Sequence, residues 1–112
     1  MLKQSDPLDA LFHALADPSR RSMIDRLSRG SASVSELAAP LNMSLPAVQQ
    51  HLNVLEASGI VSTKKVGRVR SCSLESDVLN QAQQWIAERR LLWETRLDRL
   101  GAFLEETNPN QK

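Results

Sequence analysis

The side chains best suited to chemistry are a group of uncharged amides near the middle of the chain. Gln49, Gln50 and Asn53 share one face of a predicted helix, and that face carries no acidic residue. Carboxamides can pair with the edge of an adenine base, and small apolar side chains can contact a thymine methyl group. This pattern favours DNA recognition over the alternative, a solvated polar face of a helical hairpin. The predicted contacts are Ser44, Leu45, Pro46, Ala47, Gln49, Gln50, His51 and Asn53.

A second group of candidate residues is cationic and follows the amides along the chain. Between residues 37 and 74 the only acidic residue is Glu56, whereas four cations lie around or within the Gly67-Arg68 pair. Cationic side chains beside a polyanion gain affinity by releasing counterions. The same residues could instead protect the edge of a hairpin, although their place after the amide-bearing helix favours DNA contact. The four cations are Lys64, Lys65, Arg68 and Arg70.

Arg20 lies in the first turn of another predicted helix, where a cation opposes the helix dipole. A contact with a DNA phosphate would explain this unfavourable placement, and Arg20 is therefore included among the predicted DNA contacts. A salt bridge to Asp17 or Asp25 would explain it equally well, so both interpretations stay open at this point.

The elements that must position these groups are marked by caps and turns. Ser33 and Glu36 form a capping box, and Asn42 can adopt the left-handed conformation that ends a helix. Gly59 ends the amide-bearing helix, and Gly67 marks a tight turn between two strands. The predicted helices begin at Pro7, cover residues 18–28, 34–41 and 44–58, and end with a helix from 76 or 77 to 106; the predicted strands cover 60–66 and 69–74.

Two short helices separated by a tight turn, over residues 33–41 and 44–58, are typical of a helix-turn-helix. In such a unit the second helix lies in the major groove, and its first residues contact base edges. The hairpin that follows would lie along the DNA backbone or enter the adjacent minor groove. The predicted fold class is therefore mainly α with a small β-hairpin, a winged helix-turn-helix.

The final helix is too long and too apolar to be covered by so small a domain. We expect it to pair with a second copy of the chain, making a dimer through the terminal helices. Two recognition helices would then lie about 34–36 Å apart, one turn of DNA, and the bound site would be palindromic. The alternative is a helix that folds back on its own domain. The expected interface residues are Leu8, Leu11, Phe12, Trp85, Ile86, Trp93, Leu97, Leu100 and Leu104.

The bulk properties of the 112 residues argue against several other classes of protein. The length fits one domain over residues 1–106, followed by a frayed polar tail over residues 107–112. No apolar run approaches the ~18 residues of a membrane span, and the first residues lack the plan of a signal peptide. We therefore expect a cytoplasmic protein without membrane contact. A phosphate-binding glycine loop, paired histidines and a nucleophile motif are all missing, so we expect no enzyme, metal site or cofactor.

Five stretches of the sequence together carry a family resemblance. They are ALADPSRR at 14–21, SELA at 35–38, NMSLPAVQQHL at 42–52, LEASGIV at 55–61 and GR at 67–68. With them the chain resembles the ArsR-type family of winged helix-turn-helix repressors, from about Leu8 to Leu104. The resemblance implies a dimer that binds an operator in double-stranded DNA and usually represses transcription. The alternative function is a winged-helix adaptor that binds proteins, but such modules often lose the basic wing that this chain keeps.

Many members of this family sense metals, through cysteines flanking a valine before the third helix or through aspartate and histidine on the final helix. This chain has Ser33, Val34 and Ser35 at the first position, and hydroxyls are poor ligands for soft metals. Its final helix contains no histidine. The resemblance is therefore to a subgroup lacking the metal-sensing cysteines. The single Cys72 is expected to be a small buried hydrophobe, with a redox switch as the alternative.

Overall fold

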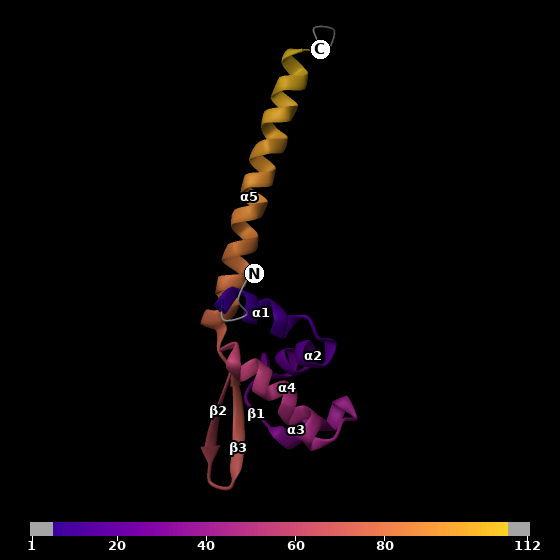
Figure 1. Ribbon diagram of the computed structural model, residues 1–112, viewed down its shortest axis with the longest axis vertical. Coiled ribbons are helices and arrows are strands. Elements are labelled where there is room, and N and C mark those ends of the chain that lie inside the picture. Colours follow the sequence, from indigo (N-terminus) through magenta and orange to yellow (C-terminus); the bar gives the residue numbers. More distant parts are fainter. Residues whose placement is uncertain (1–5, 108–112) are drawn as a thin grey trace. The chain divides into compact units, whose positions relative to one another are not determined.

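The computed structural model describes residues 6–107, which form helices and a small antiparallel sheet (Figure 1). The elements are α1 (Pro7–Leu15), α2 (Pro18–Leu27), β1 (Ala32–Ser33), α3 (Val34–Ala38), the 3₁₀ turn η1 (Ala39–Leu41), α4 (Leu45–Ala57), β2 (Val61–Val66), β3 (Val69–Leu74) and α5 (Ser76–Glu106). The chain divides into two compact units after Ala82, within α5. Of the predicted frayed tail, all but Thr107 lies outside the described residues.

The starts of α1 and α3 follow the predicted caps, because each is stabilised by a bond between neighbouring residues. The Asp6 carboxylate accepts from the Leu8 amide at 2.8 Å. The Ser33 hydroxyl accepts from the Glu36 amide at 3.2 Å, and the Glu36 carboxylate accepts from the Ser33 amide at 3.1 Å. This reciprocal pair is the predicted capping box. Local sequence therefore fixes where these helices begin.

The third helix is shorter than predicted and continues as a 3₁₀ turn. The α-helical part ends at Ala38, and Ala39–Leu41 form η1. Pro40 explains the change, because its ring nitrogen cannot donate the next helical hydrogen bond. Asn42 then adopts the predicted left-handed conformation, with φ 52° and ψ 42°.

The hydrophobic core of the first unit forms around α4, which packs against α1, α2 and α3. Its largest fully buried side chains are Leu11, Met23, Leu37, Val48, Leu52, Leu55, Ile60 and Cys72. The place of Leu11 corrects the sequence analysis, which assigned it to the dimer interface. Leu11 has no exposed surface because it points into the core of its own unit. Leu8 and Phe12, on the same helix, are half-buried.

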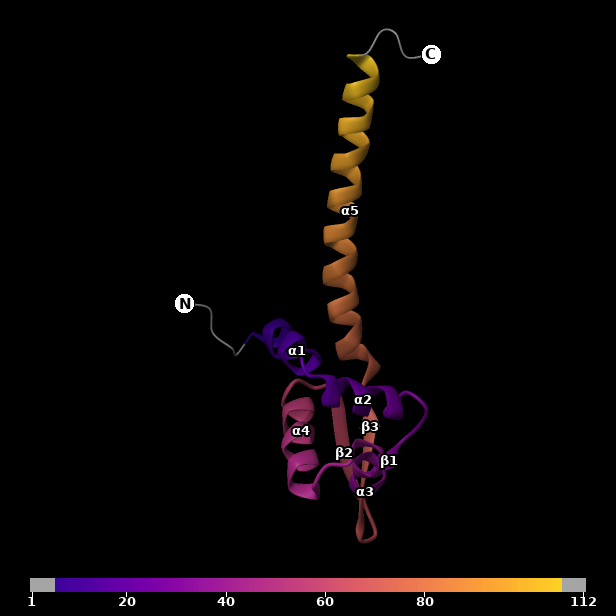
Figure 2. The same cartoon turned by 90° about the vertical axis from the view of Figure 1, so that its right-hand side faces the viewer.

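The sheet contains one more strand than the predicted hairpin, in the order β1-β3-β2. Figure 2 shows β2 and β3 as a ribbon beside α4, with β1 next to β3. The added strand is only two residues long and pairs Ala32 with Cys72 and Ser33 with Ser71. So short a strand leaves no periodic pattern in the sequence, but it ties the start of α3 to the hairpin.

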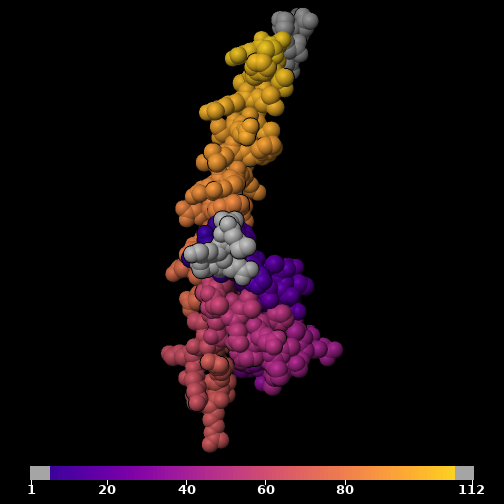
Figure 3. Space-filling view, viewed as in Figure 1, coloured from indigo at the N-terminus to yellow at the C-terminus, as the bar shows by residue number. Residues whose placement is uncertain are grey.

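The β2–β3 hairpin ends in the predicted tight turn. Val66 and Val69 are the last pair in register, and Gly67 between them has φ +65°, a conformation that favours glycine. The tip forms a thin projection in the space-filling view (Figure 3). This projection is the wing of a winged helix-turn-helix.

Candidate nucleic-acid interface

The turn that precedes α4 leaves the first residues of this helix exposed to solvent. The left-handed Asn42 redirects the chain, and the Ser44 hydroxyl then caps α4 by accepting from the Ala47 amide at 3.3 Å. Leu45 and Pro46 follow as exposed residues, and 53% of the surface of Leu45 remains accessible. An exposed leucine at a helix start is available to contact a partner such as a thymine methyl group.

The predicted amide face of α4 is present, and two of its amides are hydrogen-bonded to each other. The Gln49 side-chain amide donates to the Asn53 carbonyl oxygen at 2.9 Å, one helical turn away. Gln50 and Asn53 are exposed and Gln49 is half-buried, whereas Val48, Leu52 and Leu55 of the same helix are in the core. The pair therefore presents its remaining donors and acceptors as one ordered unit rather than as two free side chains.

The wing concentrates positive charge on one face of the β2–β3 hairpin. Lys65 and Arg70 are direct partners across the two strands, so their side chains lie on the same face. Like charges in this arrangement destabilise a hairpin unless an anion lies between them. One hollow on this face is lined by Thr63, Lys65, Arg68 and Arg70. A neighbouring groove is lined by Arg68 and Arg70 on one side and by residues 33–35, at the start of α3, on the other. Three of the four predicted wing cations thus line this hollow, whereas Lys64 pairs with Ser71 on the opposite face of the hairpin.

Arg20 corrects the sequence analysis, since its guanidinium is engaged inside the first unit rather than free to contact a phosphate. Only 9% of the residue is exposed. Its Nε donates to the carbonyl of Ala14 at 2.8 Å, and its Nη2 donates to the carbonyl of His13 at 2.9 Å. Neither predicted salt bridge forms; Asp17 instead accepts from the Arg20 backbone amide at 3.1 Å. Arg20 therefore ties the end of α1 to the start of α2.

His51, one of the predicted DNA contacts, lies beside the start of α2. Its Nδ1 is 3.3 Å from Nη1 of Arg20 and 3.9 Å from Oδ2 of Asp17. The side chain keeps 21% of its surface exposed. This contact joins residues that lie 31 positions apart, and no local sequence pattern indicates it.

The residues where family members hold metals do not fit a metal ion here. The Ser33 hydroxyl is occupied as the cap of α3, and Ser35 offers only another hydroxyl. Within residues 6–107, no group of three or more histidine, cysteine or acidic side chains could hold a metal ion. The buried Cys72 thiol is on β3. Hydroxyls without thiolates or imidazoles make a poor site for a soft metal.

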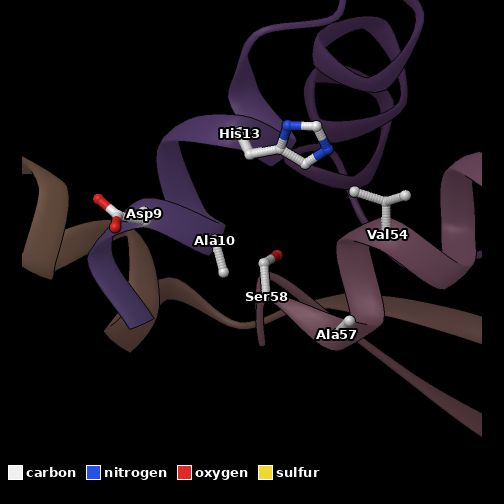
Figure 4. Close-up of a pocket in the computed structure, with 6 residues that line it drawn as sticks. All are labelled: Asp9, Ala10, His13, Val54, Ala57 and Ser58. Carbon is white, nitrogen blue, oxygen red and sulfur yellow. The ribbon is translucent and has the colours of Figure 1, made fainter. Parts of the chain in front are cut away.

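A separate hollow lies between α1 and the second half of α4 (Figure 4). It has a volume of about 340 Å³ and is lined by Asp9, Ala10, His13, Val54, Ala57 and Ser58. Figure 4 shows the His13 ring directed toward Val54 across the gap. The Ser58 hydroxyl is already used, because it donates to the Leu55 carbonyl at 2.8 Å. The hollow does not include the residues predicted to contact DNA.

The fold and this surface define a winged helix-turn-helix protein. A family model for a helix-turn-helix domain matches residues 15–63. The chain is 30% identical to the transcriptional repressor SdpR of Bacillus subtilis strain 168 over 79 residues, which are 70% of this chain and 88% of the repressor. It is 48% identical to an ArsR family transcriptional regulator of known crystal structure, with a TM-score of 0.76 over 80% of this chain and 98% of the other. The chain belongs to the ArsR family of transcriptional regulators.

A third comparison concerns a homodimeric winged helix-turn-helix DNA-binding domain from Mycobacterium bovis, solved by NMR. It is 26% identical, with a TM-score of 0.63 over 81% of this chain and 94% of that domain. The predicted family and fold class are confirmed, and the chain is a DNA-binding regulator of transcription. Among residues 6–107, no helix is both long and apolar enough to cross a membrane.

Proposed function

We propose that this chain binds a palindromic site in duplex DNA as a homodimer and represses transcription by occupying that site. The observation that carries the proposal is the placement of two surfaces in one unit. An ordered amide pair lies on α4, and Lys65 and Arg70 face each other across the wing. Amides read base edges, whereas cations on a ribbon bind the backbone whatever its sequence.

Three further features support the proposal. SdpR, which shares 30% identity, is a transcriptional repressor, and the related Mycobacterium bovis domain is a homodimer. The second unit exposes a row of large apolar side chains that a second copy could cover. We also propose that the chain lacks catalytic activity, acts in the cytoplasm, and belongs with family members that lack metal-sensing cysteines.

The proposed palindromic site can be tested by selecting bound fragments from genomic DNA and aligning the recovered sequences. We expect a pseudo-palindrome whose half-site centres lie about one helical turn apart. A reporter gene behind that site should be expressed less when the protein is added. Recovered sequences without two-fold symmetry would contradict dimeric recognition, and rising expression would contradict repression.

We assign base recognition to the amides and backbone binding to the cations. Three single variants test these roles when their affinities for the selected duplex and for a random duplex are compared. Gln49→Ala and Asn53→Ala should cost about 1–3 kcal/mol on the selected site and little on random DNA. Arg68→Ala should weaken binding to both duplexes alike. It should also reduce the slope of log affinity against log salt by about 0.9, the value for one phosphate contact. Gln81→Ala, an exposed amide on α5, is the matched control. Equal losses on both duplexes for all three variants would contradict these roles.

The alternative function, a protein-binding adaptor, predicts a different salt response. A DNA-binding wing loses duplex affinity steeply as salt rises, by about 0.9 log units per log unit of salt for each phosphate contacted. An adaptor would retain no duplex even in dilute buffer. The like-charge pair on the wing favours the DNA-binding function.

A further inference from the structure

Arg20 connects three segments of the first unit through a single buried guanidinium. Two of its nitrogens donate to the carbonyls of His13 and Ala14 at the end of α1. The third nitrogen, Nη1, lies 3.3 Å from Nδ1 of His51 on α4. Because a guanidinium is planar and its donors form a rigid fork, occupying two of them fixes the direction of the third. Nη1 is thus aimed at the His51 ring by contacts made elsewhere.

The chemistry of this contact determines which nitrogen of His51 carries the proton. Arginine can only donate, so the Nδ1 that faces it at 3.3 Å must supply a lone pair. A neutral imidazole with an unprotonated Nδ1 carries its hydrogen on Nε2. The nearby Asp17 carboxylate oxygen is 3.9 Å from the same Nδ1, which is too far for it to accept a hydrogen bond from this nitrogen. The geometry therefore selects the Nε2–H tautomer.

We propose that Arg20 is a positioning residue that holds His51 as the Nε2–H tautomer, so that the far ring nitrogen is a hydrogen-bond donor for DNA. His51 lies on the same face of α4 as Ala47, another predicted contact four residues earlier, and its side chain is partly exposed. A fixed donor there would pair with an acceptor on a guanine or thymine edge or with a phosphate oxygen. The DNA part of this inference rests on the proposed function, whereas the tautomer does not.

The tautomer is measured without DNA, by long-range ¹H–¹⁵N correlation of the histidine rings in the ¹⁵N-labelled full chain at a pH where His51 is neutral. The chain has two histidines, and His13→Gln identifies the signals of His51. We expect an Nε2–H pattern for His51 in the unmodified protein. An Nδ1–H pattern, or a fast mixture of both tautomers, would overturn the inference whether or not the protein binds DNA.

Two neighbouring arginines provide a matched comparison. Arg20→Gln removes the donor to His51, whereas Arg21→Gln removes the same charge from an exposed residue that donates to the Leu15 carbonyl at 2.7 Å. We expect the His51 tautomer to become mixed only in Arg20→Gln. If Arg20→Gln does not fold, Arg20→Lys keeps the buried charge but lacks the planar fork, and the same change in tautomer is expected.

Binding measurements on the fragment selected above and on a random duplex complete the test. We expect roughly a fivefold loss of affinity in the Arg20 variant beyond any loss in Arg21→Gln, the effect of about one hydrogen bond. A loss confined to the selected fragment places the acceptor on a base, and an equal loss on both duplexes places it on the backbone. Equal affinities of the Arg20 and Arg21 variants would contradict the role of Arg20 in DNA binding. If the unmodified protein binds neither duplex, the proposed function itself is contradicted.

Discussion

Cys72 lies in the centre of the sheet, between Thr63 on β2 and Ala32 on β1. It is fully buried, and burial raises the pKa of its thiol; the Glu56 carboxylate raises it further, while Arg70 opposes the shift. A thiol reacts as the thiolate, so both its pKa and its lack of access protect it. The structure therefore favours a packing role over the alternative redox switch.

This protection predicts the reactivity of the thiol. Native protein should react with a thiol reagent such as DTNB roughly a hundredfold more slowly than urea-unfolded protein at the same pH. The measurement is the absorbance change with time, with the unfolded chain as its own control. Complete labelling of the folded protein within the time taken by the unfolded chain would instead restore the redox interpretation.

Asp17 is one of the residues whose charge stabilises the first unit in a pH-dependent way. Its carboxylate accepts from the Arg20 amide, and this bond lowers its pKa below the ordinary 3.8; burial opposes the shift, and His51 and Arg20 assist it. A carboxyl whose pKa is lower in the folded than in the unfolded state stabilises the fold above the unfolded value. That contribution is lost as the pH falls below about 4 toward the native pKa.

Asp17→Ala should therefore lower the free energy of unfolding by about 1 kcal/mol at pH 7, the usual loss for a helix cap. The difference from the unmodified protein should shrink as the pH falls from 5 toward 3, because the native carboxylate then takes up a proton. Urea unfolding across this range measures it, with Asp25→Ala, an exposed acid on the same helix, as the control for charge. A difference that stays constant would show that the Asp17 charge contributes nothing.

At the scale of elements, a glycine shapes the connection from α4 to the wing. Gly59 has φ +82°, and a Cβ built there would lie 3.1 Å from a methyl group of Val78 at the start of α5. Any other residue would meet both a strained backbone and a packed neighbour. Gly101, within α5, meets nothing within 4 Å.

Gly59→Ala should consequently destabilise the first unit by about 1–3 kcal/mol. Gly101→Ala, the same change without strain in a helix interior, should be neutral or stabilise the helix by up to about 1 kcal/mol. Thermal unfolding followed by circular dichroism compares them. Identical melting temperatures for the two variants would contradict the strain assigned to position 59.

The helices and the wing could be predicted from sequence because their signals are local. The Ser33–Glu36 box and the left-handed Asn42 each involve residues that are close along the chain. What sequence did not indicate depends on tertiary contacts. The apolar stripe of α1 does not say which of its residues face inward, so Leu11 was placed at an interface. Arg20 finds its carbonyl partners only once α1 has packed beside α2. The DNA contacts on α4 and the wing stay predictions.

At the scale of the whole molecule, the second unit has no buried side chain of its own over residues 83–107. Within residues 83–106, large apolar side chains recur at intervals of seven, four, three and four residues, the spacing of a coiled-coil face. They are Ile86, Trp93, Leu97, Leu100 and Leu104, and each is about half exposed. Covering such a row would stabilise a small protein by roughly 25 cal/mol for each Å² of apolar surface buried. Dimerisation would supply that cover and would place two DNA-binding units on one duplex.

The last prediction follows from this row. Leu97 is 48% exposed, so Leu97→Glu should leave the first unit folded while placing a charge in the middle of the apolar face. Sedimentation equilibrium should show a dimer for the unmodified chain and a monomer for the variant. Because a monomer presents one wing instead of two, the slope of log affinity against log salt should fall by about half. Thr95→Glu adds the same charge about 200° around the helix and should change neither quantity. If Leu97→Glu remains dimeric and keeps its salt slope, α5 does not form the interface.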